Sequence, residues 1–323
     1  MNEKMKKGAS VLVNTCAEVK QGEQALIIVS PATMNVGLVV LDELKHKTNS
    51  IIFECMPEPK IHGEEPPETV AKNMMAADIV FCLTPMSLAH TKARKDATSA
   101  KTRYLSLPDY SLNVLKSPAL HTDFTEIEPV CYELADKLDI ATRVRVTNPA
   151  GTDITFSIEK RTANRCPGIV RKPGDLGSPP DAEVNIAPLE GFGEGIIAVD
   201  GSVPCPNIGV VDKPIFLTIE KSTVVKVNCE NKEVEAEVNR LFEDAGPKSR
   251  IIGEFGIGLN PNAVLCGVML EDEGCAGTIH FGIGSNATIG GTNDVAFHLD
   301  FILREPTVWI GQEKLLEDGS IRL

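Results

Sequence analysis

The order of hydrophobic and polar positions follows one pattern over roughly the first 140 residues. Short, nearly continuous apolar runs indicate buried strands at residues 25–30, 50–55, 78–84 and 102–107. Apolar positions at helical spacing predict helices at residues 34–44, 68–77, 90–100 and 124–141. Strands that alternate with helices predict a doubly wound parallel sheet with helices on both faces.

The pattern changes after about residue 142. Residues 143–158 alternate by twos around an Asn-Pro-Ala-Gly turn, which predicts a β-hairpin. Further strand-like runs follow, and one more helix is predicted at residues 231–245. A length of 323 residues suits two domains. We therefore expect an α/β domain with a parallel sheet at residues 1–141 and a β-rich α+β domain, which carries the chemistry, at residues 142–323.

Composition and charge exclude several classes of protein. The net charge is −13, and no stripe of basic and aromatic residues is present, so nucleic-acid binding is not expected. No apolar segment reaches the length of a membrane span, and no secretory signal is found. The nine cysteines are odd in number and lack C-x-x-C spacing, which favours reduced, mostly buried thiols in a cytoplasmic protein. The first strand is followed by Ser30-Pro-Ala-Thr instead of G-x-G-x-x-G, so dinucleotide binding is not expected either.

The residues most suited to chemistry lie between positions 277 and 300. His280 and His298 are separated by 18 residues, and Asp300 follows the second histidine by two. In a strand, residues two apart face the same side, so His298 and Asp300 would form a pair of ligands for a divalent metal. On spacing alone, a hydrogen-bonded pair on a half-exposed strand is the other interpretation.

Two glutamates strengthen the metal hypothesis. Glu254 lies in an apolar, glycine-rich run, and Glu183 lies where the chain enters a predicted strand. A carboxylate in such a run is costly to bury unless it is paired or bound to a metal. Taken one at a time, either glutamate could instead be solvated at a strand edge.

Several blocks of sequence, in the same order, resemble the aminopeptidase T family. They are residues 87–97, 174–188 around Glu183, 190–202, 253–263 around Glu254, 277–286 around His280, and the closing His298-Leu-Asp300. The likeness covers nearly the whole chain. It implies a dimeric aminopeptidase that uses a metal-activated water and two metal ions, zinc or cobalt, with manganese as another option. Carried over to this chain, the resemblance implies that the ligands are Glu183, Glu254, His280, His298 and Asp300, with Glu254 bridging.

Two departures from that family bear on the substrate. The family commonly has a tyrosine seven residues after its first histidine, where this chain has Ala287. The stretch between His280 and His298 is also shorter than in the peptidases. A small non-peptide amide is therefore a second candidate substrate beside a peptide.

The short loop before His298-Leu-Asp300 is also similar to that of 2,5-dihydroxypyridine dioxygenase. That resemblance implies a non-haem Fe(II) ring-cleaving enzyme with one iron held by two histidines and one carboxylate. In that relative a histidine stands at the position of Glu254, and none stands at that of His280. The residues here favour the hydrolase, so we expect a metallohydrolase of amide bonds and keep the dioxygenase as the alternative. A third possibility is a ligand-binding descendant without activity.

The remaining candidates are His90, two arginines and two cysteines. In the dioxygenase-like relatives a histidine in the block of His90 does acid–base work, and we expect the same role here; a surface histidine at a helix start is the alternative. Arg161 and Arg165 could bind a substrate carboxylate, although ordinary surface arginines are favoured. Cys266 and Cys275 are expected to pack in the core.

Overall fold

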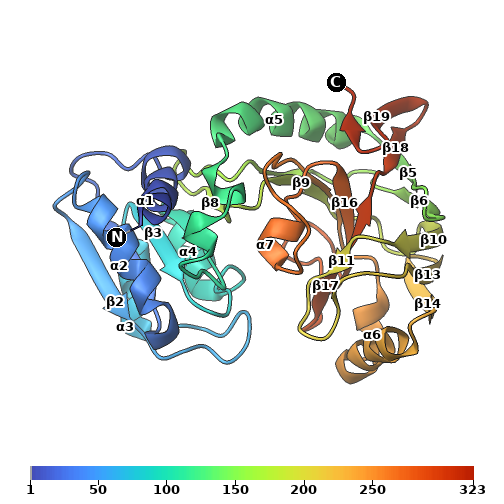
Figure 1. The fold of residues 1–323 in the computed structure, drawn as a ribbon, viewed down its shortest axis with the longest axis horizontal. Coiled ribbons are helices and arrows are strands. Elements are labelled where there is room, and N and C mark those ends of the chain that lie inside the picture. The colour runs from blue at the N-terminus through green and yellow to red at the C-terminus, as the bar shows by residue number, and fades with distance from the viewer. Residues whose placement is uncertain (1) are drawn as a thin grey trace. The chain divides into compact units, whose positions relative to one another are not determined.

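The structure, a computed structural model, describes residues 2–323 and divides into two compact units (Figure 1). The first unit comprises Met1–Glu126 and Gly168–Pro180, and the second comprises Ile127–Pro167 and Asp181–Leu323. We expected a single boundary between residues 141 and 142, whereas the chain passes between the units after residues 126, 167 and 180. The return of residues 168–180 has a local reason: a short strand there pairs with the sheet of the first unit.

The first unit is built on a five-stranded parallel sheet. Its strand order is β2-β1-β3-β4-β8. The four strands expected from the apolar runs are confirmed, and the fifth was not expected. Their bounds are β1 Ala25–Val29, β2 Ile51–Cys55, β3 Ile79–Leu83, β4 Arg103–Ser106 and β8 Leu176–Gly177.

Helices cover both faces of this sheet, as expected. α3 and α4 pack over the face that carries Leu26 and Ile28. α2 packs on the opposite face, where Gly37 lies against the Val29 side chain. The helices are α1 Glu3–Ser10, α2 Met34–Leu44, α3 Glu68–Ala76 and α4 Lys92–Ser99, and α5 Phe124–Ile140 leads into the second unit. α1 was not expected, because its sequence is short and strongly polar; the π-helical segment Val11–Cys16 continues it.

The second unit contains two large, mainly antiparallel sheets. The eight-stranded sheet has the order β14-β13-β10-β6-β5-β18-β19-β20, and the seven-stranded sheet has the order β12-β11-β17-β16-β15-β9-β7. The first is formed by β5 Arg143–Thr147, β6 Asp153–Ser157, β10 Gly193–Val199, β13 Ile215–Glu220, β14 Thr223–Cys229, β18 Thr307–Ile310, β19 Glu313–Glu317 and β20 Ser320–Ile321. The second is formed by β7 Asn164–Cys166, β9 Glu183–Ile186, β11 Ser202–Val203, β12 Gly209–Val210, β15 Phe255–Gly258, β16 Thr278–Gly284 and β17 His298–Arg304.

The two sheets share an apolar core. The ring of Phe156 on β6 lies 5.2 Å from that of Phe255 and 5.7 Å from that of Phe281, which join the sheets face to face. α6 (Lys232–Ala245) begins after Asn231, whose side chain caps it, and contacts β14. The expected hairpin, β5 and β6, and the expected helix α6 are confirmed, as is the β-rich α+β class of this unit.

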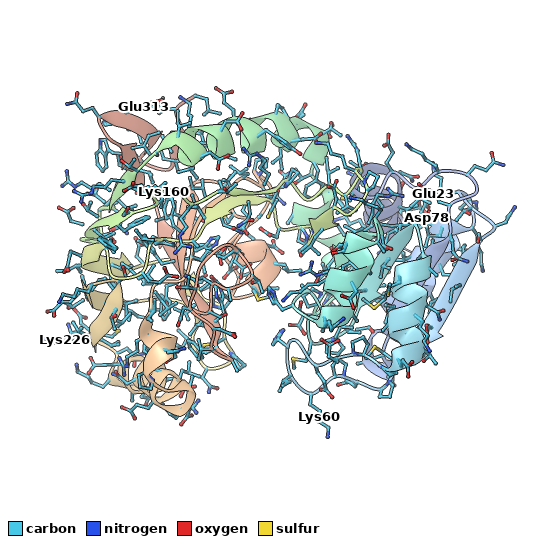
Figure 2. The ribbon with its side chains drawn as sticks, turned by 180° about the vertical axis from the view of Figure 1, so that it is seen from behind. Glu23, Lys60, Asp78, Lys160, Lys226 and Glu313 are labelled. Carbon is cyan, nitrogen blue, oxygen red and sulfur yellow. The ribbon has the colours of Figure 1, made fainter. Side chains whose placement is uncertain are left out.

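The polar surface fits the charged composition. Charged side chains such as those of Lys160, Lys226 and Glu313 are exposed (Figure 2). Among residues 2–323, no helix has both the length and the apolar character that a bilayer crossing requires.

Candidate metal centre

Four of the five predicted ligands lie on three strands of the seven-stranded sheet. The register pairs Gly282 with Asp300 and Gly284 with His298, so alternate residues of β16 and β17 share a face. His280 is on that face as well, and β15 joins it to β9 and Glu183. The intervening residues, among them Phe281 and Phe301, are buried on the other side of the strands. Alternation by two thus separates the site from the core.

The donor atoms form two groups that share one glutamate. His280 Nε2 lies 3.1 Å from Glu183 Oε2 and 3.9 Å from Glu254 Oε1. His298 Nε2 lies 3.2 Å from Glu254 Oε2 and 3.2 Å from Asp300 Oδ1. Glu183, Glu254 and His280 therefore form one possible metal-binding group, and Glu254, His298 and Asp300 form the other. All five residues singled out from the sequence come together.

Two glycines make this close approach possible. A Cβ atom on Gly256 would lie 2.1 Å from His280 Nε2, and one on Gly282 would lie 2.6 Å from His298 Nε2. Each glycine belongs to a Phe-Gly-Ile-Gly segment, at residues 255–258 and 281–284. In these segments the apolar residues face the core and the glycines face the donors. This repeated alternation is visible in the sequence, but the prediction of the donors did not use it.

The charges of the donors are strongly coupled. Burial lowers the pKa of His280, but the carboxylates of Glu183, Glu254 and Asp300 together hold the pKa well above its ordinary value. Burial likewise lowers the pKa of His298, but the carboxylates of Asp300 and Glu254 together hold it well above its ordinary value. Conversely, burial raises the pKa of Asp300, but His298 and His280 together bring it well below its usual range. Without a cation, protons on the imidazoles balance the carboxylates, and a bound divalent ion would take over that role.

The donor set fits a divalent metal. Glu183 Oε2 is buried, is not engaged in a hydrogen bond of suitable geometry, and lies 3.1 Å from His280 Nε2, so the two donor atoms converge. Two ligand atoms that each lie about 2.1 Å from one ion, with an angle of about 90° at the ion, are about 3 Å apart. The distances between the donor atoms of the histidines and their nearest carboxylates match this value. His298 Nδ1 donates to the Ser285 carbonyl at 2.9 Å, which leaves the Nε2 lone pair for a metal. Imidazole and carboxylate together suit first-row divalent ions, iron among them.

Two further carboxylates next to the donors were not foreseen. Asp181 is buried, and its Oδ1 has no hydrogen-bond partner. Burial and the Glu183 carboxylate raise the pKa of Asp181. Burial and the neighbouring Asp300 carboxylate raise the pKa of Glu273. Asp181 stands two residues before Glu183, a spacing that could have indicated it, whereas nothing in the sequence around Glu273 singles it out.

The remaining candidate residues lie elsewhere. His90 is exposed two residues before α4, in the first unit, whereas the five donors are in the second. Its acid–base role stays a prediction. Ala287 is exposed in the loop between β16 and β17.

Both arginines are engaged by carboxylates of the chain. Arg161 pairs with Glu190, and Arg165 binds Asp136 at 2.6 Å and Asp139 at 2.7 Å.

The two cysteines near the donor segments differ in exposure. All nine cysteines of the chain are free, and Cys275 is buried as expected. Cys266, however, is exposed, so the expectation that it packs in the core was wrong. The buried Asp272 binds the backbone of the loop that carries Cys266: its Oδ1 accepts a hydrogen bond from the Cys266 N–H at 2.7 Å. The Cys266 side chain is on the solvent side.

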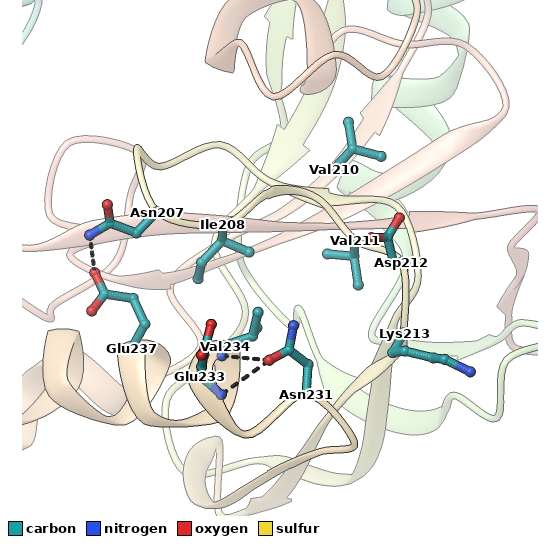
Figure 3. Close-up of a pocket in the computed structure, with 10 residues that line it drawn as sticks. All are labelled: Asn207, Ile208, Val210, Val211, Asp212, Lys213, Asn231, Glu233, Val234 and Glu237. Carbon is teal, nitrogen blue, oxygen red and sulfur yellow. Dashed lines mark hydrogen bonds between the residues drawn. The ribbon is translucent and has the colours of Figure 1, made fainter.

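A cavity of about 390 Å³ lies next to the start of α6 (Figure 3). Asn207, Ile208 and Val211 line it on one side, and Val234 and Glu237 line it on the other (Figure 3). None of its lining residues is a metal donor. The candidate chemistry of the second unit therefore stays with the two donor groups.

Comparisons with known proteins place this geometry in a family. The model of the NicX family, described as 2,5-dihydroxypyridine 5,6-dioxygenase, matches residues 5–323. The 2,5-dihydroxypyridine 5,6-dioxygenase of Pseudomonas putida KT2440 is 23% identical over 313 residues, which cover 90% of this chain and 87% of that protein.

Two solved structures share the fold. The 2,5-dihydroxypyridine dioxygenase of Pseudomonas putida KT2440 superposes with a TM-score of 0.80 at 19% identity, covering 99% of this chain and 97% of the other. Wild-type AmpT from Thermus thermophilus superposes with a TM-score of 0.74 at 14% identity, covering 99% of both chains. At such identities the likeness supports the fold alone.

The family match corrects the expected chemistry. The hydrolase, metallopeptidase and aminopeptidase assignment was wrong, because the matching family consists of oxidoreductases and AmpT is similar only in fold. The error arose because the choice rested on the donor types at two positions, Glu254 and His280. Histidines and carboxylates serve both chemistries, so two positions are weaker evidence than a family match over residues 5–323. The chain belongs to the 2,5-dihydroxypyridine 5,6-dioxygenase family.

Proposed function

We propose that this chain is a metal-dependent dioxygenase that opens the ring of 2,5-dihydroxypyridine or of a closely related dihydroxylated aromatic compound. The observation that carries the proposal is the family match over residues 5–323, which includes every candidate donor. The metal we propose is Fe(II), in place of the two zinc or cobalt ions expected from the sequence.

The residues proposed to hold the metal are the two groups that share Glu254. Each group has one histidine and two carboxylates, so neither by itself has the two histidines and one carboxylate common among non-haem iron oxygenases. Glu254 is the natural anchor, because it belongs to both groups. Ferrous iron supplies the oxygen-activating redox chemistry that protein side chains lack. The His298 side chain is 33% exposed, so a ligand can reach this side of the site.

The surrounding residues have proposed roles that do not depend on whether the chain binds one metal ion or two. Ser285 sets the tautomer of His298 through its carbonyl oxygen. His90 is proposed to accept or donate a proton of the substrate hydroxyl, a role that imidazole side chains commonly have in acid–base catalysis. Glu273 is proposed to orient Asp300: its raised pKa favours a protonated carboxyl group, which could donate a hydrogen bond to the Asp300 carboxylate. The homodimer expected from the sequence also stays a prediction.

The test is oxygen uptake by anaerobically purified protein. We expect protein loaded with Fe(II) to consume one O₂ for each 2,5-dihydroxypyridine lost, and zinc-loaded protein to consume none. Glu254→Gln should lose both bound iron and turnover, whereas His90→Gln should keep its iron and lose turnover. Full iron loading without oxygen uptake on 2,5-dihydroxypyridine and on related dihydroxypyridines and catechols would contradict the proposal.

A further inference from the structure

Next to the metal donors lies a pair of asparagines to which none of the comparisons assigns a role. Asn185 follows Glu183 by two residues in β9, so both side chains are on the donor face of the sheet. β7 pairs with β9 in a register that sets Asn164 directly opposite Asn185. Side chains opposite each other on neighbouring strands are in contact range. Two amides and one metal donor therefore form a continuous row.

The hydrogen bonds along this row have a defined direction. Asn185 Nδ2 donates to Glu183 Oε1 at 2.6 Å, and Asn164 Nδ2 donates to Asn185 Oδ1 at 2.7 Å. The amide thus occupies one oxygen of the Glu183 carboxylate. The other oxygen, Oε2, is the one that converges with His280 and has no hydrogen bond of its own. Asn185 is 5% exposed, so water cannot easily replace this donor.

The row continues to the loop between β16 and β17. Asn164 Nδ2 also lies 3.5 Å from the Ile289 carbonyl oxygen, a long contact at the tip of that loop. The start of the loop contacts the other donor group, where the Ser285 carbonyl accepts from His298 Nδ1 at 2.9 Å. Residues 285–293, the donor loop, therefore contact one donor group directly and the other through Asn164 and Asn185.

The donor loop is well suited to fix positions. Asn286 and Asn293 are buried and bind each other: Asn293 N donates to Asn286 Oδ1 at 2.7 Å, and Asn286 N donates to the Asn293 carbonyl at 3.0 Å. Glu190 accepts from Asn286 Nδ2 at 2.9 Å and from Thr292 N at 2.7 Å. The bonds between Asn286 and Asn293 and those to Glu190 restrict the motion of the loop, so its carbonyl groups keep fixed positions.

We propose that Asn185 and Asn164 are positioning residues of the metal centre. Asn185 holds Glu183 so that Oε2 faces the metal, and Asn164 holds Asn185 and links it to the donor loop. The inference rests on the proposed metal site, but it does not depend on which reaction the site catalyses. Its ligand is a divalent cation, for which Co(II) serves as a coloured probe.

The experiment measures Co(II) affinity and the visible absorption of the bound ion in the full-length chain. Loss of a side chain that orients a ligand typically weakens metal binding about 10- to 100-fold. We expect a loss in this range, with a changed spectrum, for Asn185→Ala. A smaller loss is expected for Asn164→Ala. The double variant should bind no more weakly than Asn185→Ala, because Asn164 acts through Asn185.

A matched control is Asn207→Ala. Asn207 Nδ2 also donates to a glutamate, Glu237 at 2.7 Å, but at the cavity beside α6 (Figure 3). This variant should bind Co(II) as the unaltered chain does. If Asn185→Ala lowers the melting temperature of the metal-free protein but leaves the Co(II) affinity and spectrum unchanged, its role is only structural and the inference is overturned. Weakened Co(II) binding together with an absence of oxygen uptake by the iron-loaded chain would contradict the proposed function and leave this inference standing.

Discussion

At the scale of single residues, Gly256 shows how little space the donor face allows. The position opposite it on β16 is His280, whose ring occupies the volume that any side chain would need. An added methyl group must displace either the imidazole or the strand. The absence of a side chain at Gly256 is therefore required for His280 to occupy its place among the metal donors.

We expect Gly256→Ala to reduce metal binding strongly and to destabilise the protein by about 1–3 kcal/mol, the usual cost of overpacking. Metal analysis and denaturant unfolding measure the two effects. Ile257→Val is the matched control, because Ile257 is the next residue of the same strand and is fully buried on the apolar side. It should cost about 0.5–1.5 kcal/mol and leave the metal content unchanged. Equal metal content in the two variants would argue against the assigned geometry.

The donor residues were predictable one by one, whereas their supporting residues were not. Glu183, Glu254, His280, His298 and Asp300 were singled out from local sequence and resemblance, and the structure brings them together. Asn164 and Asn185 were missed because their role depends on strand register, which a single sequence does not reveal. Glu273 was missed for the same kind of reason, since it reaches Asp300 from a separate loop.

At the scale of elements, the donor loop and Glu190 form one unit. The Glu190 carboxylate accepts two hydrogen bonds from the loop and pairs with Arg161, which also donates to the Gly290 carbonyl. Arg161, considered from the sequence as a group that binds substrate, is thus engaged in holding the loop. Burial raises the pKa of the Glu190 carboxyl group, but the hydrogen bonds that it accepts bring the pKa below its ordinary value.

We expect Glu190→Gln to loosen the donor loop and to lower the free energy of unfolding by about 1–3 kcal/mol. Glutamine has an NH₂ group, which donates, in place of one of the two accepting carboxylate oxygens. Hydrogen–deuterium exchange should show faster exchange across residues 286–293 than in the unaltered chain. Glu194→Gln is the control: Glu194 is exposed on β10 and accepts only the Lys221 backbone N–H, at 3.0 Å, among the contacts described. Unchanged protection of the loop in Glu190→Gln would show that Glu190 does not hold it.

At the scale of the whole molecule, metal removal links the site to stability. Metal ions bind deprotonated imidazole and carboxylate, and the pKa values of His280 and His298 are raised, so protons compete with the metal as the pH falls. In the metal-free chain, the raised histidine pKa values stabilise the fold fully below about pH 6.5. That stabilisation is lost as the pH rises through the raised values.

Chelation should therefore lower the melting temperature more at pH 8.5 than at pH 6. At the higher pH the metal binds more tightly, and the metal-free chain has also lost the contribution of its protonated histidines. Melting curves of Co(II)-loaded and chelated protein at both values measure the difference. An equal effect of chelation at the two values would contradict the coupling between the donors and the fold.

The division of the chain into two units lies at this scale as well. The change of pattern near residue 142 correctly indicated two kinds of architecture. It did not indicate that residues 168–180 return to the first unit, because β8 has only two residues and leaves no periodic pattern. Hydrophobic periodicity identifies long elements, while a two-residue strand is defined only by its partner β4.

By itself, the sequence determined the class of each half and most of the longer helices and strands, and its resemblance to known families added the identity of the candidate donors. These features depend on local periodicity and on residue type, which can be read directly from the sequence. Only the tertiary structure decided that Glu254 is common to two donor groups, that Gly256 and Gly282 make room for the imidazoles, and that an asparagine row joins Glu183 to the donor loop. Those features depend on register and on contacts between residues far apart in sequence. The choice between hydrolase and dioxygenase followed from neither. The donor types at Glu254 and His280 favoured the hydrolase, and the family match over residues 5–323 overturned that choice.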